Sequence, residues 1–575
     1  MKRLWAALGL WLTALVACGP GHPTGLLFDN ATIVDGSGAA PFRADVLVRD
    51  GRIAEILASE QGQIQPDGLR RVDAEGLVLS PGFIDLHSHA DLVLLADAPQ
   101  RNGLIEAKLR QGVTTWIVGN CGLGVAPADP PTAALLESIN SWMTPEGVQV
   151  GAIDTAGYLE SLTSQQLPIN VGTLVPHGPV RISAMGLRAG PPDAAELDAM
   201  RRQIQRGLRA GAFGVSTGLI YPPGMYSDPA ELQALAAEVA ESDGLWTTHV
   251  RGSSETLLPA TEELIELARV TGVRVHHSHL EAVGTRFWPQ IDGVLGLEDR
   301  AREEGLSVSH DLFLYTRAAT MMSAIFPPWA LEGGMPRLLE RLRDRETRRR
   351  IGSELQHRVP QWPPWEAHGW PHNLVEAVGW DGIYVASLAA RQDDPRIGKS
   401  LAALGQELQQ DPFDVVADLM LEFDGGVGQW VGEISGDDEQ HAGLQTILRH
   451  PSSAIVSDAE DYGTGVPHPA HAGAFVRALR WAREGKGPSL PVTVRKMTTY
   501  PAELLGLPDR GQIRVGHVAD LVLFDPDTVG DRSEWLRPRR HAAGIAMVLV
   551  GGHAVVDGGL YSPEARGQVL RRPTR

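Results

Sequence analysis

Residues 81–89 of the chain are P-G-F-I-D-L-H-S-H, a strand-like run that ends in two histidines. Successive side chains of a strand alternate between its faces, so His87 and His89 share a face, roughly 6–7 Å apart along the strand. Histidine pairs of this spacing are commoner on surface loops, but the preceding Pro-Gly and apolar residues indicate the end of a buried strand. Inside a barrel that face is the lumen, where two imidazoles suit one metal ion.

Seven more strand-like runs follow along the chain, and helix-like stretches such as 230–241 and 262–271 separate several of them. The runs cover residues 113–121, 168–177, 212–217, 246–250, 273–280, 306–312 and 453–458. Eight strands that alternate with helices predict an α/β fold, a TIM-type (β/α)8 barrel. Polar residues stand at the C-terminal end of nearly every run, which is where such barrels keep their active sites.

The segments that flank the barrel contain short apolar runs broken by turn residues. Residues 25–80 include the hairpin signal Asp50-Gly51, and residues 508–560 have a similar pattern. We predict that these two segments form one small β-sandwich beside a barrel that covers residues 81–507. Within the barrel, residues from about 320 to 445 fit the alternation poorly and are predicted to form an insertion over its mouth. Residues 561–575 are predicted to form a tail.

Composition excludes some classes of partner. The formal net charge is −19 and the isoelectric point is near 5.5, which argues against nucleic acid and against electrostatic binding to anionic membranes. Hydrophobic residues make up 43% of the chain, which suits a globular enzyme with a large core. Beyond the N-terminal segment, no run reaches the roughly 18 uninterrupted apolar residues of a membrane span. A small-molecule substrate is therefore expected.

The N-terminus has the pattern of an export signal. Two cations precede an almost wholly apolar stretch up to Ala17, which is too short for a spanning helix of roughly 20 residues. Cys18 follows Leu-Val-Ala, which resembles a bacterial lipobox. We predict a lipoprotein signal peptide over 1–17 and a lipidated cysteine with a tether over 18–24. Gly19, in place of an aspartate, favours an outer-membrane anchor with the enzyme in the periplasm. An ordinary signal peptide with a chance cysteine is the alternative.

Cys121, in V-G-N-C-G-L-G, is the only other cysteine of the chain. If Cys18 carries lipid, no intramolecular disulfide can form. A lone thiol is often a small buried hydrophobic side chain. The other interpretation is a metal ligand, since Cys121 ends the second strand of the predicted barrel.

Further candidate ligands stand at the ends of later strands. His249 ends L-W-T-T-H and Asp458 ends A-I-V-S-D, while strand alternation puts His277 and His279 on one face and His276 on the other. Imidazole, thiolate and carboxylate groups together describe a zinc-type site, because thiolate is a poor ligand for calcium or magnesium. The predicted metal centre consists of His87, His89, Cys121, His249 and His279, with Asp458 beside them.

These motifs resemble the amidohydrolase superfamily, and most closely its D-aminoacylase (N-acyl-D-amino-acid deacylase) family. The resemblance runs from about residue 25 to 560 and is weakest in the insertion. The motifs that carry it are P-G-F-I-D-L-H-S-H-A-D, V-G-N-C-G, S-T-G-L-I-Y-P-P-G, T-H-V-R, S-H-L, S-D and R-K-M-T-T-Y-P-A-E-L-L-G-L-P-D-R-G-Q-I-R-V-G-H-V-A-D-L-V-L-F-D-P. It implies a zinc-dependent hydrolase of a linear amide bond.

The resemblance also implies roles for single residues. Asp458 matches the general base that takes a proton from the attacking water, and Tyr221 matches a tyrosine that contacts the substrate near the scissile amide. One Zn²⁺ is implied to bind tightly, with a second, weaker position beside it. The implied ligands are Cys121, His249 and His279 for the tight site and His87 and His89 for the weaker position.

The chain departs from the family where relatives hold a free carboxylate of the substrate. After S-H-L the family has a lysine and this chain has Glu281; the family motif Y-P-Y-x-x-x-S becomes F-L-Y (313–315) followed by Ala319; and the arginine of H-P-R becomes Ala470. A carboxylate at position 281 would repel a substrate carboxylate. We therefore expect a neutral, cationic or cyclic amide as substrate.

The alternative is that other residues take over the recognition of a carboxylate and that the substrate class is unchanged. Arg251, Arg317, His468 and His471 are the candidates for this role. The predicted substrate-binding residues are therefore Tyr221, Arg251, Glu281, Tyr315, Arg317 and His468.

Two other functions remain as alternatives. A cyclic amidase of the hydantoinase or dihydroorotase type shares the superfamily. Cys121 argues against it, because the resemblance implies that those enzymes have a lysine between their metals where this chain has Cys121. A non-catalytic surface lipoprotein could have kept only the fold, but the complete set of ligands together with Asp458 argues against that. An assay of a linear and a cyclic amide side by side would distinguish the linear amide hydrolase from the cyclic amidase.

Overall fold

The computed structural model describes residues 25–58, 68–365, 369–389, 391, 393–564 and 566–573. The predicted signal peptide (1–17), the lipidation site Cys18 and the tether up to residue 24 lie outside these residues. None of the helices in the described part of the chain is both long and apolar enough to cross a membrane.

Eight parallel strand positions form the barrel within the described residues, each at one of the eight predicted runs, although β10 and β11 extend one residue beyond theirs. Their order is β6-β7-β8 in one sheet and β9-β10-β11-β12-β13-β17 in the other. Only Leu174 separates β8 from β9, and the Asp458 N–H donates to the His87 carbonyl at 3.1 Å, which joins β17 to β6. The predicted TIM-type barrel is therefore confirmed. Its strands are β6 (Phe83–Asp85), β7 (Val113–Val118), β8 (Asn170–Thr173) with β9 (Val175–Pro176), β10 (Gly214–Gly218), β11 (Leu245–His249), β12 (Arg274–His277), β13 (Val308–Leu312) and β17 (Ser453–Ile455).

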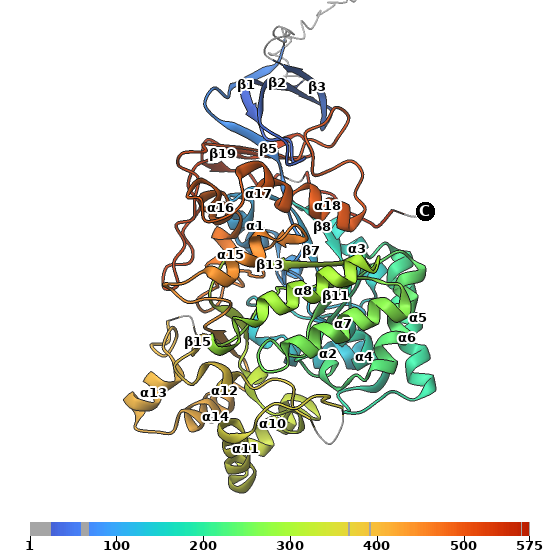
Figure 1. The fold of residues 1–575 in the computed structure, drawn as a ribbon, viewed down its shortest axis with the longest axis vertical. Helices are drawn as coiled ribbons and strands as arrows, with labels where there is room; N and C mark the ends of the chain where they lie inside the picture. The colour runs from blue at the N-terminus through green and yellow to red at the C-terminus, as the bar shows by residue number, and fades with distance from the viewer. Residues whose placement is uncertain are drawn as a thin grey trace, which may run out of the picture.

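The barrel strands are buried on both faces, because helices cover the outside (Figure 1). All six residues of β7, V-T-T-W-I-V, are buried. Aspartates accept hydrogen bonds from the first turns of several covering helices, as Asp193 does in the capping box of α5. The covering helices are α1 (Ala98–Leu109), α2 (Pro130–Ile139), α3 (Thr155–Ser164), α4 (His177–Met185), α5 (Ala194–Ala210), α6 (Pro229–Glu241), α7 (Leu257–Thr271), α8 (Gln290–Glu303), α15 (Ala442–Arg449), α16 (Ala470–Arg483), α17 (Leu490–Met497) and α18 (Thr499–Leu505).

The two ends of the chain form one β domain at the top of Figure 1, as the sequence predicts. Its sheet has the order β21-β20-β19-β18-β5-β1-β2-β3, with β4 paired to β1. The antiparallel β5–β18 pair joins the N-terminal half to the C-terminal half, and apolar side chains of both halves share one core. The strands are β1 (Leu26–Ile33), β2 (Phe42–Arg49), β3 (Arg52–Ala58), β4 (Arg70–Asp73), β5 (Val78–Pro81), β18 (Leu521–Phe524), β19 (Ile545–Val550), β20 (His553–Asp557) and β21 (Leu560–Tyr561).

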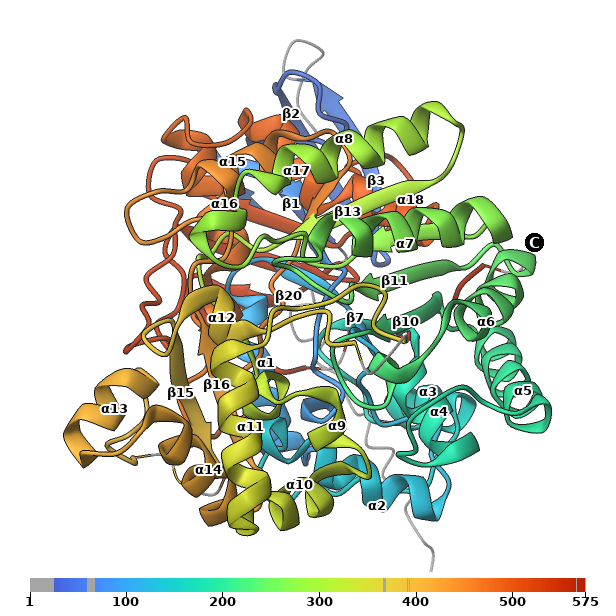
Figure 2. The ribbon, with the colours of Figure 1, turned by 60° about the horizontal axis from the view of Figure 1, so that its bottom comes forward.

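The predicted insertion lies at the opposite end of the barrel from the β domain (Figures 1 and 2). It contains a three-stranded sheet of order β14-β16-β15, whose residues form part of the wall over the strand ends. This arrangement confirms an insertion near the barrel mouth. Its elements are β14 (Ala318–Met321), α9 (Pro328–Leu331), α10 (Gly334–Arg343), α11 (Arg345–His357), α12 (Leu374–Val378), β15 (Ile383–Leu388), α13 (Leu401–Leu408), α14 (Pro412–Glu422) and β16 (Val427–Val431).

The segment predicted as a tail packs against the barrel. The Val171 N–H of β8 donates to the Gln568 carbonyl at 2.9 Å, and the Leu570 N–H donates to the Val171 carbonyl at 2.7 Å. Leu570 is buried. Residues 568–570 therefore pair with β8 at the edge of its sheet. So short a segment has too few apolar residues to predict this pairing from the sequence.

Candidate metal centre and active site

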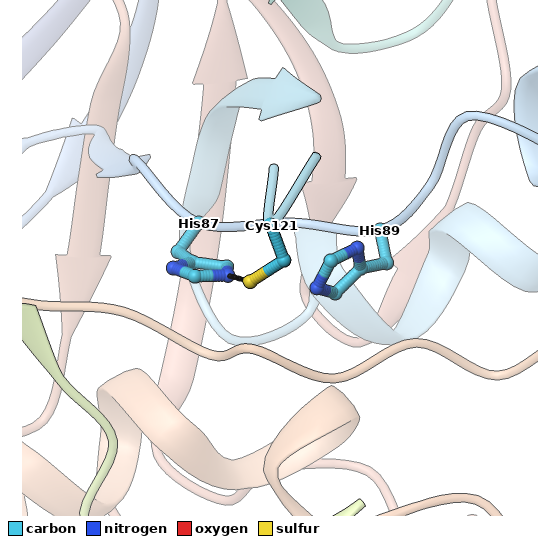
Figure 3. Close-up of side chains that lie close together, drawn as sticks. All are labelled: His87, His89 and Cys121. Carbon is cyan, nitrogen blue, oxygen red and sulfur yellow. Dashed lines mark hydrogen bonds between the residues drawn. The ribbon is translucent and has the colours of Figure 1, made fainter. Parts of the chain in front are cut away.

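Six side chains from five barrel strands meet at the C-terminal ends of those strands. His87 and His89 follow β6, and Cys121 follows β7, and their side chains point toward one another (Figure 3). The other three come from further around the barrel: His249 at the end of β11, His279 after β12 and Asp458 after β17. The six are those that the sequence predicts for the metal centre.

The Cys121 thiol lies at the middle of this cluster. Its Sγ is 3.2 Å from His87 Nε2, 3.6 Å from His279 Nε2 and 3.9 Å from His249 Nδ1. Sulfur and nitrogen ligands on one tetrahedral zinc ion stand about 3.5 Å apart, given zinc–ligand distances of about 2.3 and 2.0 Å. The donor atoms therefore have the spacing that one ion of this kind requires.

Three overlapping trios of donors in the cluster each have their ligand atoms within 4.8 Å of one another. Cys121 belongs both to the trio with His249 and His279 and to the trio with His87 and His89. Asp458 Oδ1 lies at the edge, 3.3 Å from His89 Nε2 and 3.4 Å from His87 Nε2. The thiolate thus occupies the position between two sets of imidazoles.

The charges of the cluster favour a cation. Burial disfavours the Cys121 thiolate, but His87 and hydrogen bonds from His249 and His279 hold the pKa of the thiol well below its usual value. Burial likewise disfavours a charged imidazole, yet Asp458 and Cys121 raise the pKa of His89 to about 9. Burial and the neighbouring His279 lower the pKa of His249 to about 4, so that it is a neutral ligand. The residues present fit a divalent metal ion.

The backbone at this site takes conformations that non-glycine residues rarely adopt. Cys121, His279 and Asp458 have φ values of 51°, 34° and 46°. Such left-handed residues persist only where the surrounding structure holds them, and they cluster at functional sites. Gly122 follows with a φ of 65°, and a Cβ there would lie 2.8 Å from the Gly218 backbone nitrogen. The glycine therefore lets the turn that presents Cys121 pack against β10.

Asp311, near the end of β13, contacts three groups of the cluster, and it was not among the predicted site residues. Its Oδ2 lies 2.9 Å from His276 Nε2 and 3.4 Å from His87 Nδ1, and its Oδ1 accepts from the His279 backbone N–H. Burial opposes its ionisation, but His87 and His276 hold its pKa well below the usual value. The sequence signal that could have identified Asp311 is an acid near the end of the strand-like run L-S-V-S-H-D-L.

The predicted side-chain directions of His276 and His277 in β12 are wrong. His276, not His277, points toward the metal centre, where it contacts Asp311. His277 Nδ1 lies 3.3 Å from Glu298 Oε1 of α8, on the outer side of the barrel. Because β12 ends at His277 and His279 has a left-handed backbone, the alternation of a strand does not continue to His279.

We expect Asp311→Asn to lower the affinity for zinc about 10- to 100-fold, because carboxylates that orient metal-binding imidazoles contribute that much. The measurement is zinc competition against a chelator of known affinity, with thermal unfolding as a check of folding. Asp299→Asn, in an exposed acid of α8, is the control and should leave zinc affinity unchanged. Equal zinc affinity of Asp311→Asn and the wild type would contradict a supporting role.

A buried lysine holds together the segments on either side of the site. Lys108 Nζ of α1 lies 3.1 Å from Asp85 Oδ2 and 3.3 Å from Glu460 Oε1, and it donates to Ser457 Oγ. Ser88 Oγ donates to Glu460 Oε1 at 2.8 Å. Burial raises the pKa of Glu460 to about 7. The network therefore fixes Ser88, which lies between His87 and His89, relative to Ser457 and Glu460 on either side of Asp458.

Two adjoining cavities open from the metal centre, and they share His89, Trp142, Ala319, Thr320 and Asp458. The first, which we call the Glu281 cavity, is also lined by Cys121, Tyr221, His249, His279, Glu281 and His372. The second, which we call the His468 cavity, is also lined by Gln429, Trp430, Glu460, Tyr462 and His468. A substrate with a group on each side of a scissile bond could place one group in each cavity.

The sequence profile of a protein family, described as the amidohydrolase family, matches residues 70–351 and 423–556 of the chain. The chain belongs to the amidohydrolase family. It is 33% identical over 551 residues to N-acyl-D-glutamate deacylase of Alcaligenes xylosoxydans xylosoxydans. The aligned region covers 95% of this chain and 96% of the relative. It is 30% identical over 556 residues to D-aminoacylase of the same organism, which covers 96% and 98%.

A solved structure agrees with this assignment. The crystal structure of N-acyl-D-glutamate deacylase from Bordetella bronchiseptica, complexed with zinc and a phosphonate inhibitor, matches with a TM-score of 0.77 and 31% identity. The match covers 95% of this chain and 99% of that one. This amidohydrolase is therefore a metal-dependent hydrolase of carbon–nitrogen bonds other than peptide bonds, as the sequence predicts.

The structure brings three of the six predicted substrate-binding residues to the cavities of the amidohydrolase. Tyr221 and Glu281 line the Glu281 cavity, and His468 lines the His468 cavity. Arg251, Tyr315 and Arg317 line neither. His372, from the insertion, lines the Glu281 cavity and was not predicted, since nothing in W-P-H-N-L distinguishes it from a surface histidine.

Arg251 is held away from the cavities by partners of its own. Its Nε lies 2.8 and 2.9 Å from the two carboxylate oxygens of Glu263, and its other nitrogens donate to the Met225 and Ser227 carbonyls. β11 ends at His249, so the alternation that would place Arg251 on the same face does not extend to it.

Arg317 and Tyr315 make contacts outside the cavity linings, and the Tyr315 ring packs edge-on against His468, 5.0 Å between centroids. The Arg317 guanidinium lies over the Tyr384 and Trp535 rings and pairs with Asp438 at 3.1 Å. The Tyr315 ring lies under the guanidinium of Arg477, 3.7 Å away.

The histidines named as alternatives are neutral. His468 Nε2 bonds to the Arg317 carbonyl at 2.7 Å and its Nδ1 accepts from the Ala470 N–H at 3.1 Å, while burial lowers its pKa to about 3. His471 Nε2 lies 3.1 Å from the Pro538 carbonyl, and burial lowers its pKa to about 4. Neither can balance the charge of a substrate carboxylate.

Proposed function

We propose that this amidohydrolase is a zinc-dependent deacylase, which hydrolyses the linear amide bond of an N-acyl compound in the manner of D-aminoacylase. The observation that carries the proposal is the position of Cys121 between two sets of imidazoles, with Asp458 at their edge. The names of the relatives, N-acyl-D-glutamate deacylase and D-aminoacylase, support the reaction type. The substrate is proposed to lack the free α-carboxylate that would require a cation in the cavity.

A zinc ion held by Cys121, His249 and His279 would polarise the scissile carbonyl and make water a stronger nucleophile. Asp458 would accept the proton of the attacking water and deliver it to the leaving nitrogen. Its position suits this role, because it lines both cavities and therefore reaches both sides of a bound amide. Burial opposes its ionisation, but His87, His89 and His279 lower its pKa, so the carboxylate is ready to accept a proton.

Tyr221 is proposed to donate a hydrogen bond to the carbonyl oxygen as negative charge develops there. The side chain lines the Glu281 cavity, and its ring packs edge-on against His249, 5.1 Å between centroids. Its hydroxyl lies 2.8 Å from Thr320 Oγ1, which fixes its direction. Burial raises its pKa well above 10, so the phenol keeps its proton and stays a donor.

A substrate panel on zinc-loaded protein tests this function against the cyclic amidase alternative. N-acetyl-D-amino acids and their carboxamides represent linear amides, and hydantoin and dihydroorotate represent cyclic amides. Hydrolysis of a linear amide without ring opening is the expected result. Ring opening without hydrolysis of any linear amide would replace the proposal with a cyclic amidase.

We also propose that the enzyme is exported as a lipoprotein, anchored through Cys18 with the barrel in the periplasm. The support is the lipobox-like L-V-A-C at residues 15–18 after a short apolar stretch. Labelling of cells with a radioactive fatty acid should mark the wild-type protein and not Cys18→Ser. Equal labelling of both proteins would contradict the anchor.

A further inference from the structure

We infer that this amidohydrolase recognises a positively charged group on its substrate and that Glu281 contacts that group. The inference rests on the proposed amide hydrolysis, since it concerns the cavity where that reaction would occur. The class of substrate is an amide that carries an ammonium group a few bonds from the scissile carbonyl, such as a mono-N-acylated diamine.

One carboxylate oxygen of Glu281 is without a hydrogen-bond partner among the described residues. Glu281 lies two residues beyond His279, lines the Glu281 cavity and is 8% exposed. Its Oε1 is 3.8 Å from His279 Nδ1, which is longer than a hydrogen bond. Its Oε2 is buried and has no hydrogen-bond partner among the described residues. A buried carboxylate oxygen without a donor is unfavourable, and a substrate that donates to it would remove that cost.

The charges around the two cavities favour a cation. Among the described residues, no lysine or arginine lines either cavity, while Glu281, Asp458 and Glu460 do. Lys108 lies 3.3 Å from Glu460 but also pairs with Asp85 at 3.1 Å, so this group adds no net positive charge to the cavity. A divalent ion in the centre would be balanced by the Cys121 thiolate and the Asp458 carboxylate. The charge of Glu281 is then left without a partner, and a carboxylate-bearing substrate would be repelled.

The cations that could reverse this balance are held elsewhere. Arg251 is paired with Glu263 and Arg317 with Asp438, and neither lines a cavity. His468, which does line one, uses both ring nitrogens in hydrogen bonds to backbone groups. A substrate carboxylate would therefore enter a cavity in which Glu281 is the nearest side chain of unbalanced charge.

A different role for Glu281 is the support of His279. A carboxylate beside a metal-binding imidazole commonly orients the ring, and its loss lowers metal affinity about 10- to 100-fold. The two roles have different consequences. Support of His279 would alter zinc affinity and leave the preference among substrates unchanged, whereas contact with the substrate would alter the preference and leave zinc affinity unchanged.

The test uses three N-acetyl compounds that differ in one group. They are N-acetyl-alanine, N-acetyl-alaninamide and 2-acetamido-1-aminopropane, in both enantiomers, which carry a negative, a neutral and a positive group at neutral pH. Binding is measured by calorimetry on zinc-loaded wild type at low temperature, where turnover is slow, so that Asp458 keeps its charge. Hydrolysis is measured on zinc-loaded wild type through acetate, which all three compounds release.

We expect the ammonium compound to bind at least about tenfold more tightly than the carboxylate compound. Glu281→Gln should bring that ratio close to one without a change in zinc affinity, and Glu281→Lys should reverse it. Glu266→Gln removes the same charge from an exposed side chain of α7 and should keep the wild-type ratio. Thermal unfolding checks that each variant is folded.

Equal or tighter binding of the carboxylate compound would overturn the inference, and this outcome needs no Glu281 variant. Loss of zinc affinity in Glu281→Gln with an unchanged charge preference would also overturn it, because Glu281 would then support His279. If the ammonium compound binds best but no compound releases acetate, the proposed hydrolysis fails while the charge recognition stands.

Discussion

Asp458→Asn should lower kcat about 10²- to 10⁴-fold, which is the usual contribution of a general acid–base residue. The carboxylate faces both cavities and lies 3.3 Å from His89 Nε2, so it is placed at the reacting amide. Asparagine keeps the size of the side chain and the backbone bond to His87 but cannot take the proton. KM and zinc content should therefore stay close to those of the wild type, and steady-state kinetics with metal analysis checks all three quantities.

The control for this variant is Asp461→Asn, three residues further along. Asp461 pairs with Arg539 through both oxygens, and it lines neither cavity. It should keep a kcat close to that of the wild type even if the variant is slightly less stable. Activity that survives in Asp458→Asn would show that another group takes the proton, such as the cavity carboxylate Glu460.

The barrel and the metal centre could be predicted because their signals are local. Each barrel strand is a short apolar run, and parallel strands are buried on both faces, so the pattern is visible without knowledge of the partners. The C-terminal ends of the strands meet at one rim, which brings Cys121 and His249 together although they are 128 positions apart. Side chains with metal-binding chemistry at those ends therefore predict a common site.

Strand alternation predicted side-chain directions only within the strands. His277 was placed on the side of the metal centre because it lies two residues before His279. β12 ends at His277, and the chain turns at His279 with a φ of 34°, so the count does not carry across this point. Directions beyond a strand end depend on the loop that follows, whose conformation is set by contacts with distant segments.

The supporting residues could not be predicted, because their roles depend on partners far away in sequence. Asp311 supports His87, 224 positions earlier, and an acid at a strand end does not indicate which imidazole it will meet. His372 reaches the Glu281 cavity from the insertion, where its Nδ1 lies 3.4 Å from the Ser253 backbone nitrogen. Only the folded position of the insertion over the barrel mouth identifies it as a cavity residue.

Cys121→Ala should abolish tight zinc binding and, with it, hydrolysis. The thiol is the donor common to two of the trios, so its loss leaves neither with three ligands. Zinc affinity should fall by more than the about 10- to 100-fold that follows loss of a supporting residue. A ligand at 100 times its Kd stabilises a protein by about 2.7 kcal/mol, so the wild type should melt at a higher temperature when zinc is added. In Cys121→Ala that rise should disappear.

The same measurement decides between the two interpretations of a lone buried cysteine. A thiol that only fills space would leave the zinc response of Cys121→Ala intact and change only the melting temperature of the metal-free protein. Cys121→Asp is the matched variant, because it restores a negative donor of similar reach. It should bind zinc more weakly than the wild type but more tightly than Cys121→Ala. That order follows only if the charge and the donor atom at position 121 matter, since alanine and aspartate both remove the sulfur from its contacts with His87 and His279.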